Sequence, residues 1–229
     1  MNDNLADVTS EANEIVEGIA EILPRVLDGR EAIMMMKNEG SRNWRQMEWI
    51  GFWFEHLVDT KVDSALGVRR GPSYGKTRFD IERQFVWDLK AHPAGSADLI
   101  LNDQEAVEEC IDEHGGLGFI IVNGTATYDT DGAFKAWHDD LKGKKSDYEV
   151  ERENRGARSR IRKTSFRPGS IDAVWLADAN AISNGRKGGW LGGFQEGMRN
   201  SDGQSRRPKY KLNTVTRPSG IVLAHRDLN

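Results

Sequence analysis

The segment 42–58 (RNWRQMEWIGFWFEHLV) constrains the fold more than any other, because it reads as a helix that is apolar almost all the way round. Ser41 precedes it as a candidate cap. A helix that is apolar on every side has to be buried on several sides. Its exceptions are Glu48 and Glu55, which are seven residues apart and therefore about 20° from each other around the helix. The chain must build a sizeable core around a helix that carries two acids.

The composition is that of a folded chain of this length. Of its 229 residues 38% are hydrophobic, and seven are tryptophan, which argues against disorder. The single cysteine, Cys110, excludes a disulfide scaffold. No apolar run reaches the roughly 18 residues that a membrane span needs, and the N-terminus lacks the basic and apolar regions of a signal peptide. We expect a cytoplasmic protein with no membrane association.

Hydrophobic periodicity predicts an α/β protein with a mixed β-sheet flanked by helices. Residues 1–229 are expected to form a single domain, with a helical N-terminal arm (1–41), a core (42–122) and further helices, strands and basic additions (123–229). Besides 42–58, the predicted helices are 10–27 with a kink at Pro24, 30–38, 102–114 with Asn102 as its cap, and 131–142. The predicted strands are 77–82, 85–91, 117–122 and 171–176.

The strand predicted at 85–91 carries an acid and a base two positions apart. Alternation along a strand places Asp88 and Lys90 on one face and Trp87, Leu89 and Ala91 on the other, and His92 continues the polar face. The chain has two other Asp-x-Lys triplets, at 59–61 and 140–142, but both fall in or at the end of helices and read as surface charge. Only the triplet at 88–90 has strand geometry that would direct both groups to one metal-centred site.

A second carboxylate is needed, because Mg²⁺ usually takes one or two carboxylates together with waters and substrate phosphate. Asp80 lies eight residues before Asp88, in the preceding predicted strand. If the two strands form a hairpin, a two-residue turn pairs 80 with 87, whereas a three-residue connection at 83–85 pairs 80 with 88. We therefore predict the three-residue connection or a bulge, with Glu55 as a third acid. Buried acids in such number are costly unless they pair or bind metal.

Asp80, Asp88 and Lys90, which read as FD-x7-DLK, resemble the PD-(D/E)XK nuclease signature, and Phe79 stands in place of its proline. The predicted order over 42–122 is also similar to the αβββαβ core of that superfamily. The resemblance implies that Asp80, Asp88, the Leu89 carbonyl and the acid Glu55 hold Mg²⁺, for which Mn²⁺ can substitute. It also implies that Lys90 orients the attacking water or helps to deprotonate it. His92 is a weaker candidate for contact with the scissile phosphate.

The net charge of −4 hides an asymmetry, because residues 151–229 carry 16 basic and 7 acidic side chains and the rest of the chain carries 16 and 29. Such an asymmetry favours a polyanionic partner at one end. We expect DNA contacts from two basic clusters and from the loop before Asp80, although a solvated, ion-paired surface is the alternative reading. The candidates are Lys76, Arg78, Arg155, Arg158, Arg160, Arg162, Lys163, Arg167, Arg206, Arg207 and Lys209.

The sequence thus favours a Mg²⁺-dependent endonuclease that cleaves double-stranded DNA. Among such nucleases, the basic additions suggest a type II restriction endonuclease, which would act as a homodimer. The sequence leaves open whether a cognate methyltransferase acts on the same DNA site without binding to this protein. The alternatives are a repair or recombination nuclease that reads DNA structure, a DNA-binding module with a decayed nuclease core, and a purely structural protein.

Overall fold

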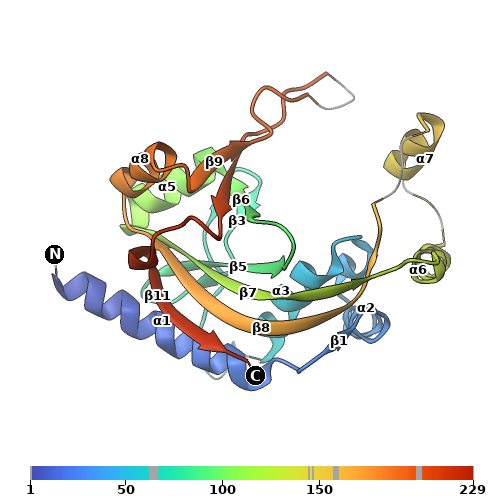
Figure 1. Ribbon diagram of the computed structural model, residues 1–229, viewed down its shortest axis with the longest axis horizontal. Coiled ribbons are helices and arrows are strands. Elements are labelled where there is room, and N and C mark those ends of the chain that lie inside the picture. The colour runs from blue at the N-terminus through green and yellow to red at the C-terminus, as the bar shows by residue number, and fades with distance from the viewer. Residues whose placement is uncertain are drawn as a thin grey trace.

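The computed structural model describes residues 2–61, 67–143, 145, 147–156, 160–199 and 203–228 (Figure 1). The helices are α1 (Asn2–Ile22), α2 (Gly29–Asn38), α3 (Trp49–Lys61), α5 (Gln104–His114), α6 (Ala133–Lys142), α7 (Asp147–Asn154) and α8 (Ala179–Lys187), with the short 3-10 helices η1 (Arg42–Arg45) and η2 (Ser219–Ile221). The strands are β1 (Leu27–Asp28), β2 (Ser73–Tyr74), β3 (Thr77–Arg78), β4 (Ile81–Glu82), β5 (Val86–Pro93), β6 (Asp98–Asp103), β7 (Leu117–Tyr128), β8 (Lys163–Leu176), β9 (Leu191–Phe194), β10 (Lys209–Asn213) and β11 (Val222–Asp227).

The main sheet is mixed, as the sequence predicted. Its strands run in the order β1-β8-β7-β5-β4, and β11 also pairs with β8. β5 and β7 are parallel and are connected through β6 and α5, whereas the β4–β5, β7–β8 and β8–β11 pairs are antiparallel. β7 and β8 are long and curved and form the middle of the sheet in Figure 1. A smaller sheet has the order β6-β10-β9, and β2 pairs with β3.

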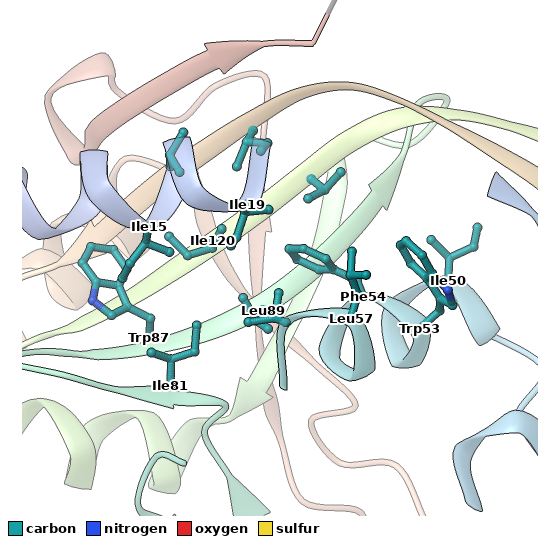
Figure 2. Packing of buried hydrophobic residues seen from close by; sticks show 14 of the residues in the cluster. Ile15, Ile19, Ile50, Trp53, Phe54, Leu57, Ile81, Trp87, Leu89 and Ile120 are labelled. Carbon is teal, nitrogen blue, oxygen red and sulfur yellow. The ribbon is translucent and has the colours of Figure 1, made fainter. Parts of the chain in front are cut away.

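Two apolar clusters cover the two faces of the main sheet. The first cluster lies between the sheet and helices α1, α2 and α3; Figure 2 shows Ile15 and Ile19 of α1 and Phe54 of α3 beside Trp87 and Leu89 of β5. The second cluster joins the opposite face to α5, α8 and the smaller sheet. The apolar side chains from Val86 to Ala91 of β5 therefore enter one packed layer or the other, which holds the strand in place.

The alternation predicted for β5 is confirmed. Trp87, Leu89 and Ala91 contribute to the first cluster, whereas Val86 belongs to the second. Asp88 and Lys90 continue the Val86 face, because side chains two apart in a strand share a face.

Some predicted helices have different bounds. α1 begins at Asn2 and ends at Ile22 instead of running to 27, because the residue before Pro24 is disfavoured in helical conformation. The helix predicted at 42–58 is divided into η1 and α3, and Ser41 caps η1 by accepting a hydrogen bond from the Asn43 amide. Asn102 is not a helix cap but lies within β6, a strand that the sequence analysis did not predict.

The strand predictions were correct in position but not in extent. The run 77–82 is interrupted at Phe79 and Asp80, which leaves β3 and β4 as two short pieces. β7 and β8 extend well beyond the predicted 117–122 and 171–176, because each pairs with the other along nearly its whole length. β9, β10 and β11 were not predicted. Within the described part of the chain, no helix is long and apolar enough to cross a membrane.

Candidate active site

The β4–β5 hairpin has the register that a paired carboxylate site requires. Ile81 pairs with Trp87 and Glu82 with Val86, so three residues, 83–85, connect the strands. Continued by one position, this register places Asp80 opposite Asp88. The predicted three-residue connection is therefore confirmed.

Glu11 of α1 holds this connection in place. Its carboxylate accepts hydrogen bonds from the amides of Gln84 (3.0 Å) and Phe85 (3.2 Å) and from the Trp87 indole (2.8 Å). Glu11 was not among the residues that the sequence predicted to shape the site. A signal was present, since Glu11 interrupts a helix face formed by apolar residues, and an acid in such a position needs donors from another element. The N-terminal arm thereby fixes the geometry of the hairpin.

Asp88 and Lys90 form a buried ion pair on the second face of the sheet. The Asp88 side chain is only 2% exposed. Burial lowers the pKa of Lys90, but the charges of Asp88 and Asp80 more than offset it, so the pKa of the ammonium lies above its usual value. Lys90 is therefore a fixed positive charge at neutral pH.

Asp80 reaches the same place from the break between β3 and β4. One carboxylate oxygen accepts a hydrogen bond from the Leu89 amide at 2.7 Å. The amide and carbonyl of one residue in an extended strand point to the same side, so the Leu89 carbonyl is directed toward Asp80 as well. Burial, followed by the charges of Asp88 and Glu55, raises the pKa of Asp80 well above its ordinary value.

Glu55 approaches from α3. Burial raises its pKa to about 7, with a lowering contribution from Lys90 and a further raising contribution from Asp88. Three acids thus act on one another around one ammonium. With all of them ionised, Asp80, Asp88, Glu55 and Lys90 would carry a net charge of −2.

Asn102 is a member of this site that sequence reasoning missed. Its side-chain amide donates a hydrogen bond to Asp88 at 3.1 Å, on the carboxylate oxygen that Lys90 does not contact. The alternation of the segment Asp98–Asp103 (DLILND) was the available signal for a strand, but its polar end read as a helix cap.

The donor set suits a hard divalent cation. Two carboxylates and a carbonyl lie at one strand edge, and Mg²⁺ is typically bound by one or two carboxylates and completed by waters and substrate phosphate. Within the described ranges, no three His, Cys, Asp or Glu side chains are arranged to hold a metal by themselves. The role of Glu55 as a third ligand therefore stays a prediction. Asp80, Asp88 and the Leu89 carbonyl remain a set that fits.

A cleft of about 540 Å³ is lined by Glu55, Asp80 and Leu89, and we call it the first cleft. Arg78, one of the predicted DNA contacts, also lines it. Arg69 and Arg70 also line it and are mostly exposed, paired with Glu82 and Asp59 respectively. A cleft lined by both acids and arginines can accommodate a polyanion together with a metal ion.

The first basic cluster, which comprises the candidates from Arg155 to Arg167, forms more ion pairs within the protein than the sequence predicted. Arg162 is buried and bonded to Asp139 (3.3 Å), so it does not present its guanidinium to DNA, which corrects that assignment. The remaining members differ in surroundings: Arg155 pairs with Glu151, Arg160 and Lys163 pair with Glu48, Arg167 is exposed, and Arg158 lies outside the described residues.

His92 is also bonded within the fold. It is buried, and its Nε2 atom lies 2.8 Å from the Ser96 carbonyl in the turn after β5. Burial lowers its pKa below the ordinary value. This buried imidazole supports the turn, which favours the reading of His92 as a structural residue over the weaker candidate role of a phosphate contact.

The second basic cluster has a different environment. Arg206, Arg207 and Lys209 line a second cleft of about 720 Å³, where they meet Lys76 from the loop between β2 and β3. The structure thus brings together predicted DNA contacts that are more than 120 positions apart.

Comparison with protein-family models, with curated proteins and with solved structures finds no match for this chain.

Proposed function

We propose that this protein is a Mg²⁺-dependent endonuclease that hydrolyses phosphodiester bonds of double-stranded DNA at specific sequences, as type II restriction endonucleases do. The observation that carries the proposal is the crowding of three acids, Asp80, Asp88 and Glu55, around the single ammonium of Lys90, which raises the pKa values of Asp80 and Glu55. A divalent cation would allow these acids to ionise together, and the arginines that line the first cleft suit a phosphate backbone.

The topology around the cluster supports the same class. In the antiparallel pair of β4 and β5, β5 carries Asp88 and Asp80 lies directly before β4, and α5 then leads to β7, parallel to β5. Helix α3 precedes the pair. This order is similar to the αβββαβ core of PD-(D/E)XK nucleases, with β6 inserted into the crossover and Phe79 in place of the signature proline.

The roles follow from the geometry. When bound by Asp80, Asp88 and the Leu89 carbonyl, Mg²⁺ would supply a water of lowered pKa and neutralise charge that develops on the phosphate. Lys90 would orient the attacking water and offset negative charge, since its ammonium stays protonated. Asn102 donates to the Asp88 carboxylate and would hold it in place, and Glu55 would add a third acid beside the two aspartates.

The test is cleavage of long, unmethylated DNA with Mg²⁺ or with EDTA, by the wild type, Asp88→Asn and Asp140→Asn. Asp140 is the matched control, because it belongs to another Asp-x-Lys triplet but is exposed on α6. We expect discrete fragments only with Mg²⁺, retained in Asp140→Asn and absent in Asp88→Asn. Smeared or branch-dependent products would favour a structure-reading nuclease, and DNA binding without any cutting would favour a decayed core.

A further inference from the structure

The second cleft is built by three separate parts of the chain. The β2–β3 loop contributes Lys76, the junction of β6 and α5 contributes Asp103, and the segment before β10 contributes Arg206 and Arg207. The same cleft is lined by Gln195, whose φ of 65° is unusual for a residue other than glycine. Backbone strain of this kind persists where the surrounding structure imposes it, and it occurs often at binding sites.

Asp103 holds two of the cations that line the second cleft, Arg207 and Lys209. Its side chain is 4% exposed; it pairs with Arg207 and lies 3.5 Å from the Lys209 ammonium, and the Thr77 hydroxyl donates to it at 2.7 Å. Its Oδ1 atom is buried and has no hydrogen-bond partner among the described residues. The fixed carboxylate holds Arg207 and Lys209 in place, which reduces the entropy lost when a ligand is bound.

The same strand connects this cleft to the active site. Asp103 follows Asn102 in β6, and Asn102 holds Asp88. Thr77, which binds Asp103, lies three positions before Asp80. A ligand in the second cleft would therefore be positioned by the same short segments that position the two aspartates.

The chemistry of the lining distinguishes two kinds of nucleic-acid contact. A phosphate group offers only hydrogen-bond acceptors, so a site for phosphate alone needs only donors and positive charge. The second cleft instead combines the donors Lys76, Arg206 and Arg207 with the acceptors Glu105 and Glu109 on α5. Base edges in the major groove present both donors and acceptors, and arginine is well suited to guanine O6 and N7.

We infer that the second cleft reads base edges of the DNA substrate, and that Arg206 is its principal reader of guanine. This inference rests on the proposed function for the identity of the ligand. Arg206 is exposed and makes no ion pair with any described residue, whereas Arg207 and Lys209 are engaged by Asp103. The first basic cluster is a poorer candidate, since Arg162 is buried and Lys163 pairs with Glu48.

The test is selection of bound duplexes from a random-sequence pool, read by sequencing, with Asp88→Asn as the parent protein. This substitution removes one negative charge near the scissile phosphate and makes binding measurable without cleavage. The parent is compared with Asp88→Asn carrying Arg206→Gln, Lys76→Gln or Arg226→Gln. Arg226 is the control: it is about as exposed as Arg207 and pairs with Glu17 of α1, away from both clefts.

We expect the parent to enrich a defined sequence containing guanine. Arg206→Gln should reduce the preference for guanine at one position by a factor between about five and somewhat over a hundred, which is the range for one base contact. Lys76→Gln should alter the preference in the same part of the sequence. Arg226→Gln should change nothing. The inference is overturned if the parent enriches no sequence, or if Arg206→Gln weakens binding to all sequences equally and reduces the salt dependence, as a phosphate contact would. Failure of wild-type cleavage would instead count against the proposed function, since the selection needs no cutting.

Discussion

Asp172 on β8 and Asp88 on β5 are both buried acids on the face of the main sheet that packs against α5 and the smaller sheet, but they are neutralised differently. Asp172 accepts hydrogen bonds from Asn123 (2.8 Å) and Arg217 (2.5 Å), and its other oxygen lies 2.6 Å from His225. Burial raises its pKa, but the hydrogen bonds from His225 and Arg217 outweigh burial, so the pKa lies below the ordinary value.

The acids around Asp88 lack such compensation. Lys90 and Asn102 serve Asp88, but Asp80 and Glu55 stand close by and have raised pKa values. The comparison teaches that burial alone does not mark a reactive carboxylate. An acid with matched donors stabilises the fold, whereas crowded acids with raised pKa values are candidates for a functional role, here the cation site that we propose.

The largest expected effect is on cleavage. Asp88→Asn keeps the size of the side chain but removes a charged oxygen, so we expect at least about a hundredfold loss of cleavage rate, comparable to removal of one strong transition-state contact. Single-turnover cleavage at saturating Mg²⁺ measures it. Retention of more than half of the wild-type rate would show that Asp88 is not part of the reactive group.

Asp172→Ala should act on stability. It leaves Arg217 and His225 without their buried partner, so we expect a loss of about 3–5 kcal/mol in the free energy of unfolding. Urea denaturation measures this loss. Below the unfolding transition the folded variant should retain the Mg²⁺ dependence of the wild type. A marginal change in stability with complete loss of cleavage would instead place Asp172 in the reactive group.

Glu11→Ala should affect both properties moderately. The amides of Gln84 and Phe85 and the Trp87 indole lose their acceptor, and leaving buried donors unsatisfied costs about 1–3 kcal/mol each. Because the β4–β5 connection loosens, cleavage should fall more than the loss of folded protein explains. A variant with normal cleavage at a temperature where it is fully folded would show that the hairpin keeps its register without α1.

The smallest effect concerns pH. The pKa of Glu55 is about 7 in the metal-free fold and about 4.5 when unfolded, so the folded state binds more protons between these values. The contribution of Glu55 to stability therefore falls as pH rises from about 4.5 to about 7. Glu55→Gln should flatten that part of the profile, whereas Asp140→Asn should not. Urea denaturation at several pH values in EDTA compares them, and identical slopes in wild type and Glu55→Gln would contradict the assignment.

Local features of the sequence predicted a large part of this arrangement. Alternation gave the faces of β5, and the spacing of Asp80 and Asp88 required the connection that the structure has. These features depend on residues within one hairpin, where the period of a strand limits the alternatives.

Contacts between distant segments were not predictable in the same way. Asn102 reaches Asp88 only because β6 folds beside the candidate site, and Glu11 reaches the 83–85 connection across more than 70 positions. Charge density also misled, since Arg162 lies in the most basic stretch but is buried against Asp139. Which charges remain exposed is decided by tertiary packing, about which the order of residues says little.

The most direct test of the central claim is a Mn²⁺ titration followed by electron paramagnetic resonance, with wild type, Asp88→Asn and Asp140→Asn in the presence of a short DNA duplex. Free Mn²⁺ gives a signal that is lost on binding. We predict protein-dependent loss of this signal in the wild type and in Asp140→Asn, and its absence in Asp88→Asn. Equal binding by all three proteins, or none by any of them, would contradict the claim that the excess charge around Asp88 is a cation site.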